Sequence, residues 1–310
     1  MYRYAVSVNA SLIRLPEWRK ALSESRFHRI ELSCGQYIEP QETKELVELV
    51  RNADELAGVE TASVHLPFCP FEKFPYPAGE KEREAVAEYL AEFIRLTAPL
   101  AAKNYTFHAS IEPVRPEERG MLLEQTRPVI ASLVRAAAAA GASLNVELLP
   151  RTCIGNCVEE LQALTDGMPE AAGICFDVNH LTGDGGLKRV PEFIDRLRGR
   201  LRSFHLSDYD GVDEAHWLPG LGLLDWPSVM AAIRRVPGNP LLIFETAVLK
   251  PCSGRPREIT PKQHFRNLES AAFYLENCGE LDRRIATAAL LLFFPAFGGN
   301  GILGHPDGLT

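Results

Sequence analysis

The chain has 310 residues, of which 46% are hydrophobic and 24% charged, a balance that fits a soluble globular protein with a large core. Its formal net charge of −8 argues against a protein that is held to nucleic acid by a broad basic surface. The seven cysteines are odd in number and scattered, no apolar leader follows Met1, and the longest apolar stretch (285–297) is too short to span a bilayer. We therefore expect a cytoplasmic protein with reduced cysteines and no membrane partner.

Strand-like and helix-like segments alternate along the chain. Strands are expected near 4–9, 28–33, 60–66, 103–109, 143–149, 171–178, 201–207 and 240–246. Helices are expected near 16–23, 41–57, 80–101, 117–140, 156–166, 187–198, 226–236 and 262–277. Eight β/α units favour an α/β fold of the (β/α)8 TIM barrel type. An open doubly wound sheet is disfavoured, because no Gly-x-Gly-x-x-Gly follows the first strand.

The end of the chain differs in composition from the rest. Residues 279–310 contain a charged turn, an apolar stretch and a Gly-rich end. We therefore expect a single barrel domain over 1–278, followed by a C-terminal appendage of unknown role over 279–310.

Six of the expected strands end on an apolar residue followed by a side chain that can bind a metal. These pairs are Val64-His65, Phe107-His108, Val146-Glu147, Phe176-Asp177, Phe204-His205 and Phe244-Glu245. In a barrel, the C-terminal ends of the strands meet at one mouth, where active sites lie. Alternation along each strand puts Ser63 with His65, and Asn145 with Glu147, on the inward face. The sequence therefore predicts a metal site at the mouth of the barrel.

Four of these side chains, Glu147, Asp177, His205 and Glu245, form a mixed oxygen and nitrogen set. Such a set suits one divalent cation, Mn²⁺, Zn²⁺, Co²⁺ or Mg²⁺, rather than a thiolate-type structural zinc. Burying these groups together is costly without a cation or protons to balance them. A hydrogen-bond network without a metal is the alternative interpretation.

The same region carries a family resemblance. The motifs are His-Leu-Pro-Phe (65–68), Val-Glu-Leu-Leu-Pro-Arg (146–151), Phe-Asp-Val-Asn-His (176–180), His-Leu-Ser-Asp (205–208), His-Trp-Leu-Pro-Gly-Leu-Gly-Leu-Leu-Asp-Trp (216–226) and Phe-Glu-Thr (244–246). Over about 1–278 the chain resembles the xylose isomerase-like TIM barrel superfamily, which includes sugar phosphate isomerases and epimerases and the endonuclease IV enzymes. The motifs are specific for the superfamily and less specific for the reaction.

The isomerase and epimerase branch implies a metal-dependent enzyme acting on a small carbohydrate or its phosphate. In this branch the four residues above hold one ion, and Glu147 and Glu245 exchange a proton through a metal-stabilised enediolate. His180 would then bind a substrate hydroxyl or polarise the carbonyl. Two positions depart from the ketose 3-epimerases, because Gly211 replaces an arginine and Cys153 a glutamate. Arg151 is a candidate substitute contact for a substrate hydroxyl or anion.

The endonuclease IV branch implies a phosphodiesterase that acts on abasic DNA with up to three Zn²⁺ ions. In that case one ion is held by His65, His108 and Glu147, the second by Glu147 with Asp177, His205 and Glu245, and the third by His180, Glu214 and His216. Glu214 departs from the aspartate of that family. The acidic charge and the lack of Arg-rich loops argue against a nucleic-acid partner. A keto-inositol dehydratase-type lyase and a non-catalytic sugar-binding barrel are further alternatives, and a homo-oligomer is left open.

Overall fold

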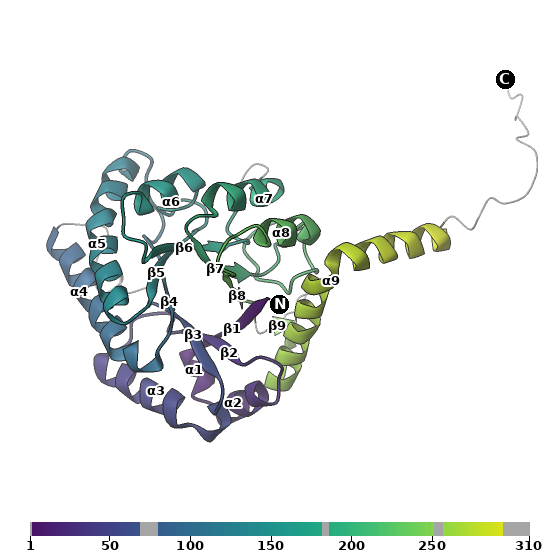
Figure 1. Ribbon diagram of the computed structural model, residues 1–310, viewed down its shortest axis with the longest axis horizontal. Helices are drawn as coiled ribbons and strands as arrows, with labels where there is room; N and C mark the ends of the chain where they lie inside the picture. The colour runs from purple at the N-terminus through teal and green to yellow at the C-terminus, as the bar shows by residue number, and fades with distance from the viewer. Residues whose placement is uncertain (1, 69–79, 182–185, 248, 251–256, 294–310) are drawn as a thin grey trace, which may run out of the picture.

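The fold is a closed barrel of eight parallel strands (Figure 1), as the alternating pattern predicts. The computed structural model describes residues 2–68, 80–181, 186–247, 249–250 and 257–293. The barrel strands are β1 (Arg3–Asn9), β2 (Arg29–Ser33), β3 (Glu60–His65), β4 (Asn104–Phe107), β5 (Ser143–Glu147), β6 (Ala172–Asp177), β7 (Leu201–Leu206) and β8 (Leu241–Phe244). Each strand pairs with its neighbour in sequence, and β8 closes the ring by pairing with β1.

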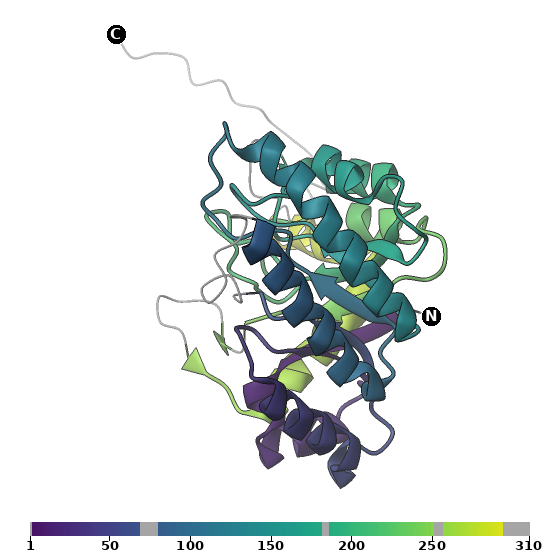
Figure 2. The same ribbon diagram turned by 90° about the vertical axis from the view of Figure 1, so that its left-hand side faces the viewer.

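Helices surround the barrel, and Figure 2 shows two of them, α4 and α5, side by side across its outside. They are α1 (Ala10–Ile13), α2 (Pro16–Ser23), α3 (Pro40–Asn52), α4 (Glu80–Thr97), α5 (Arg119–Ala139), α6 (Val158–Thr165), α7 (Gly186–Leu197), α8 (Trp226–Ile233) and α9 (Pro261–Phe293). In α4 the buried residues Val86, Leu90 and Ile94 recur at helical spacing, so the helix buries one stripe against the barrel. A short antiparallel pair of strands, β9 (Leu249–Lys250) and β10 (Arg257–Glu258), follows β8 and was not predicted.

The strands alternate between an apolar outer face and a more polar inner face, as predicted. Val64, Val146 and Phe176 join the large apolar core shared with the helices. Inside the barrel, Asn145 donates a hydrogen bond from Nδ2 to Asn104 Oδ1 at 3.1 Å. Because successive side chains of a strand point to opposite faces, the ligand-type residues at the strand ends lie on the inner face.

The last helix is longer than the sequence predicts. The expected end at 277 and the charged turn after it are wrong, because α9 continues from Pro261 to Phe293. A single glycine costs a helix only about 1 kcal/mol, and Gly279 here accepts a hydrogen bond on its carbonyl from Arg283. The final turns of α9 point away from the barrel (Figure 1). The domain boundary at 278 stays a prediction, and the Gly-rich end lies outside the described residues.

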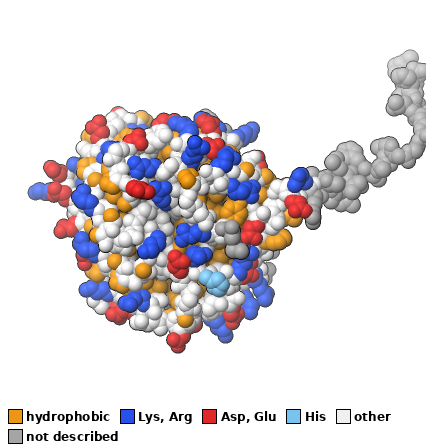
Figure 3. All heavy atoms as spheres, viewed as in Figure 1, with side chains coloured by type: hydrophobic (Ala, Val, Ile, Leu, Met, Phe, Trp, Pro, Cys, Tyr) orange, Lys and Arg blue, Asp and Glu red, His pale blue; other side chains and the backbone are white. Residues whose placement is uncertain are grey.

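The surface carries both signs of charge. On the face shown in Figure 3, basic and acidic side chains are intermingled and do not form one basic surface. Within the described part of the chain, no helix is both long enough and apolar enough to cross a membrane.

Candidate active site

The predicted site residues lie together at the C-terminal mouth of the barrel. His65, Glu147 and Asp177 are the last residues of β3, β5 and β6, and Glu245 directly follows β8. A cavity of about 460 Å³ opens there. Its lining includes all but two of the predicted residues, namely His65, His108, Glu147, Arg151, His180, Glu214, His216 and Glu245. The two others, Asp177 and His205, are fully buried beneath it.

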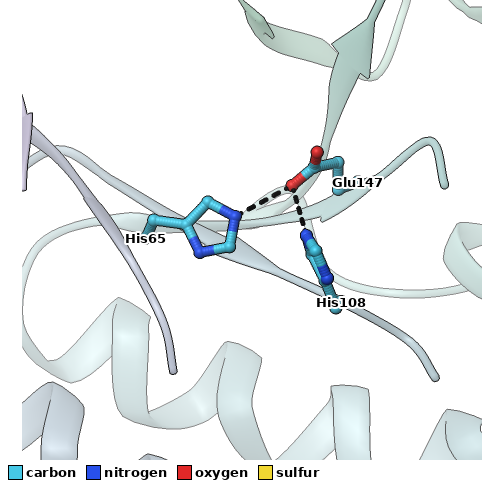
Figure 4. Close-up of side chains that lie close together, drawn as sticks. All are labelled: His65, His108 and Glu147. Carbon is cyan, nitrogen blue, oxygen red and sulfur yellow. Dashed lines mark hydrogen bonds and ion pairs between the residues drawn. The ribbon is translucent and has the colours of Figure 1, made fainter. Parts of the chain in front are cut away.

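Glu147 is at the centre of the site. Its Oε2 lies 3.1 Å from His65 Nε2 and 3.0 Å from His108 Nε2, and Figure 4 shows both imidazoles pointing at this carboxylate. Its Oε1 lies 3.2 Å from His205 Nδ1. The other nitrogen of His65, Nδ1, lies 2.8 Å from the carbonyl oxygen of Leu66, which orients the ring. Both carboxylate oxygens of Glu147 are therefore occupied by imidazole partners.

The four residues predicted to hold one cation are in reach of a common ion. In Glu147, Asp177, His205 and Glu245 one potential ligand atom from each lies within 4.8 Å of the others. Asp177 Oδ1 accepts the backbone N–H of Asn179 at 2.7 Å. Asp177 Oδ2, in contrast, is buried without a hydrogen-bond partner among the described residues. Its nearest ion-pair neighbour is His180 Nε2 at 3.5 Å. A buried carboxylate oxygen without a hydrogen bond is costly, and a cation among these four residues would satisfy it. The donor set therefore fits a divalent metal.

Two further groups of candidate ligands lie beside the central one. Within each group, the potential ligand atoms lie within 4.8 Å of one another. The groups are His65, His108 and Glu147 on one side, and His180, Glu214 and His216 on the other. His180 Nδ1 lies 2.6 Å from the carbonyl oxygen of Leu148, so its Nε2 faces Glu214 Oε2 at 3.0 Å. His216 has a backbone φ of 47°, a left-handed conformation that is uncommon for a residue other than glycine. The structure thus brings together all nine residues predicted for three ions.

Burial and ion pairing shift the acidities of these groups. Burial alone would raise the pKa of Glu147, but the imidazoles of His205 and His108 outweigh it and hold that pKa well below its usual range. Burial opposes the charged form of His180, yet Asp177 and Glu214 raise its pKa to about 10. Burial also raises the pKa of Asp177 to about 6. Burial lowers the pKa of His108, so in the metal-free protein it is the protons on His65, His180 and His205 that balance the carboxylates where a cation would otherwise do so.

Arg151 lies on the cavity wall, at a backbone φ of 47°. Its guanidinium is bound to carboxylates on two loops. Nε donates to Glu112 Oε1 at 2.7 Å, Nη1 donates to Asp213 Oδ1 at 3.0 Å, and Nη1 also contacts Glu214. Its donors are therefore engaged at the rim, and its predicted role as a substrate contact stays a prediction.

Sequence reasoning missed the structural role of Asp208. This fully buried residue follows β7 and organises the loop that carries Glu214 and His216. Its carboxylate accepts four hydrogen bonds, from the backbone N–H groups of Tyr209, Gly220 and Leu224 and from Trp226 Nε1, at 2.8–3.1 Å. A Cβ on Gly222 would lie 2.5 Å from Asp208 Oδ1, so this approach requires glycine. Asp208, Gly220, Gly222 and Trp226 all stand in the quoted motifs, which was the available signal.

Sequence reasoning also missed Glu31. This glutamate lies inside the barrel on β2, fully buried, with Oε1 at 3.1 Å from His205 Nε2. Candidate ligands were predicted from the residues at and after strand ends, whereas Glu31 stands two residues before the end of its strand.

The fold has relatives among known proteins, although no curated protein matches the sequence. A D-tagatose 3-epimerase-like protein superposes with a TM-score of 0.68 at 21% identity, covering 88% of this chain and 98% of that one. A 3-keto-D-glucoside 4-epimerase from E. coli gives 0.66 at 15% identity, covering 90% and 100%. The IolI protein with a binding zinc atom gives 0.66 at 13% identity, covering 88% and 97%. At these identities the likeness establishes a shared fold.

The family is established by a match along most of the chain. The family model described as xylose isomerase-like TIM barrel matches residues 13–268, which span seven complete strands of the barrel and most of its helices. The closed parallel ring and the ligand-type residues at its mouth agree with that match. The protein belongs to the xylose isomerase-like TIM barrel family.

Proposed function

We propose that the protein is a divalent-metal-dependent isomerase or epimerase that moves a proton next to the carbonyl group of a carbohydrate. The observation that carries this proposal is the group of Glu147, Asp177, His205 and Glu245 at the base of a cavity of about 460 Å³. That volume falls in the range of small-molecule sites. The names of similar structures, which include several sugar epimerases, support the same class of substrate.

In this proposal, Glu147 and Glu245 remove the substrate proton and return it. Their strands, β5 and β8, stand three positions apart in the ring, so the carboxylates of Glu147 and Glu245 reach the cavity from different sides. In the metal-free protein, neighbouring His205 lowers the pKa of both groups although burial opposes it, so both carboxylates are ionised at neutral pH, the form that binds a cation and can take up a proton. A bound divalent cation would polarise the substrate carbonyl and make the adjacent C–H more acidic. Taking the proton on one face and returning it on the other inverts the carbon.

The charges at the cavity favour a neutral carbohydrate over a sugar phosphate. Among the described residues that line the cavity, Arg151 is the single lysine or arginine, and its guanidinium already contacts Glu112 and Glu214. A phosphate would have to compete with these carboxylates for the same donors. Phe68 and Leu149 also line the cavity and provide apolar surface for the C–H face of a sugar.

A second function has one specific observation in its favour. The flanking groups, His65 with His108 and His180 with His216, have the composition that a three-zinc phosphodiesterase of the endonuclease IV type would use. In that enzyme Glu147 would bridge two ions and could not serve as a base. The net charge of −8 argues against binding to abasic DNA.

Metal content and a substrate panel distinguish the two functions. Purified protein loaded with Mn²⁺ or Zn²⁺ is analysed by native mass spectrometry for the number of ions per chain. It is then assayed on ketoses, their phosphates and keto-inositols for isomer formation and uptake of solvent deuterium, and on a duplex with an abasic site for cleavage. One ion with isomer formation supports the proposal. Three zinc ions with cleavage of the duplex would replace it by the second function.

The acid and base roles are tested by Glu147→Gln and Glu245→Gln. Each should lower kcat by roughly 10²- to 10⁴-fold, because positioned proton transfer contributes that much to a rate. Glu170→Gln, at an exposed position before β6, is the matched control and should leave kcat unchanged. Full activity in either site variant would exclude that glutamate from the proposed pair.

A further inference from the structure

Glu31 lies in the layer of side chains below the candidate metal centre. Its Oε2 accepts hydrogen bonds from Ser63 Oγ at 2.7 Å and from Thr106 Oγ1 at 3.1 Å. Both hydroxyls come from neighbouring strands inside the barrel and bind the same oxygen. The carboxyl group is thereby held with its other oxygen, Oε1, directed at His205 Nε2, 3.1 Å away.

The two ring nitrogens of His205 face different surroundings. Nδ1 faces the candidate ligands, at 2.9 Å from Glu245 Oε2 and 3.2 Å from Glu147 Oε1. Nε2 faces Glu31 on the opposite side of the ring. Neither His205 Nε2 nor Glu31 Oε1 has a hydrogen bond within the described part of the chain, although they are within ion-pair distance of each other. Their 3.1 Å separation is a hydrogen-bond distance, so the pair lacks only the alignment of the ring N–H with the oxygen.

We propose that Glu31 is the positioning residue of the metal centre, and that it acts through His205. A neutral imidazole carries one proton, and the nitrogen that keeps it is set by the hydrogen bond it makes. With Nε2–H donated to Glu31 Oε1, the lone pair of Nδ1 is left for the cation between Glu147, Asp177 and Glu245. This inference rests on the metal centre of the proposed function but not on which reaction the enzyme performs.

A purely structural role for Glu31 makes a different prediction. If the carboxyl group only filled the barrel, its bonds to Ser63 and Thr106 would matter and the one to His205 would not. Removing a hydroxyl that binds Oε2 should then lower the metal affinity as much as removing Oε1 does. The positioning role predicts the opposite order for metal affinity, because only Oε1 faces the imidazole.

The test compares Glu31→Met, Glu31→Gln and the control Thr106→Val in the full chain. Co²⁺ affinity is measured by competition with a chelator, the visible spectrum of the Co²⁺ protein is recorded, and thermal unfolding without metal reports the fold. Glu31→Met should weaken Co²⁺ binding by roughly 10- to 100-fold and change the spectrum, as loss of a partner of a ligand does. Glu31→Gln keeps an oxygen for Nε2–H and should stay close to wild type. Thr106→Val should bind Co²⁺ like wild type, because it leaves Oε1 in place.

Failure of the inference can be told from failure of the proposed function. If the wild-type protein binds no divalent cation, the metal centre itself is refuted and the inference with it. If wild type binds Co²⁺ and Glu31→Met binds it equally well with the same spectrum, only the inference is refuted. Should Glu31→Met not fold, long-range ¹H–¹⁵N spectra of the wild-type Zn²⁺ protein decide the matter. The proton of His205 should be on Nε2, and a proton on Nδ1 would overturn the inference.

Discussion

Replacing Asp208 with asparagine should loosen the loop between β7 and α8 while leaving the barrel closed. The carboxylate oxygens of Asp208 each accept two N–H donors, Oδ1 those of Tyr209 and Leu224, and Oδ2 those of Gly220 and Trp226. Asparagine keeps one oxygen and presents an NH₂ group in place of the other. Two buried N–H groups would then face a donor.

The magnitude follows from the two lost bonds. Hydrogen bonds to a charged group contribute about 1.5–3 kcal/mol each, so the loss is about 3–6 kcal/mol when the loop stays in place. Denaturant unfolding measures how much of this loss appears in the free energy of global unfolding. Hydrogen exchange at the amides of Gly220 and Leu224 measures local opening, and both should exchange much faster in Asp208→Asn. The candidate ligands Glu214 and His216 stand on this loop, so their positions depend on it.

Asp225→Asn is the matched control, since Asp225 caps α8 from the end of the same loop. Its Oδ1 accepts the backbone N–H of Ser228 at 3.3 Å, and asparagine caps a helix about as well as aspartate. The control should therefore change neither the free energy of unfolding nor the exchange rates. If Asp208→Asn behaves like the control in both measurements, the four hydrogen bonds do not hold the loop.

Two predictions concern protons. Burial against Trp18 lowers the pKa of His264 to about 4, whereas the unfolded value is about 6.5. Below pH 6.5 the unfolded chain therefore takes up a proton that the folded one does not, and the free energy of unfolding should fall by about 3 kcal/mol as the pH drops to 4. Urea unfolding of the metal-free protein should show this loss, and an unchanged slope in His264→Leu would refute it. Burial opposes the charged form of His205, but Cys175 and the carboxylates of Glu245, Glu31 and Glu147 raise its pKa well above its usual range, so filling the central site at pH 7.5 should release at least one proton per chain. Calorimetry in buffers of different ionisation enthalpy measures the release, and its absence would mean that the imidazole is already neutral.

The strand ends could be located from the sequence because two patterns coincide there. A buried parallel strand is read as an apolar run, and the first polar residue after it marks the mouth of the barrel, as at His65, Glu147 and Asp177. Strand alternation then assigns the inward face. Both patterns involve only residues that are close together in the chain, so they can be recognised without a three-dimensional structure.

The features that the sequence did not predict depend on contacts between distant segments. Arg151 pairs with Glu112 and Asp213 because two loops meet at the rim, and no spacing rule encodes that meeting. Glu31 is a partial exception. It stands opposite Ser63 in the register of β2 and β3, so extending the alternation argument to β2 would have placed it inside the barrel.

The buried polar atoms of the barrel indicate where a bound group belongs. A barrel interior is ordinarily filled by apolar side chains, and here Ala5, Ala62, Leu241 and Ile243 form a small buried apolar cluster of this kind. Within the described residues, eight buried side-chain nitrogen and oxygen atoms lack a hydrogen-bond partner. Six of the eight belong to Glu31, Asp177, Asn179, His205 and Thr246. Three of these atoms, Glu31 Oε1, Asp177 Oδ2 and His205 Nε2, have an ion-pair neighbour at 3.1–3.5 Å but no hydrogen bond, a state that is costly for a buried polar group. A cation at the strand ends would satisfy Asp177 directly, and by fixing the tautomer of His205 it would also satisfy Glu31. The same ion would thus provide buried polar atoms in two layers of the barrel with interaction partners.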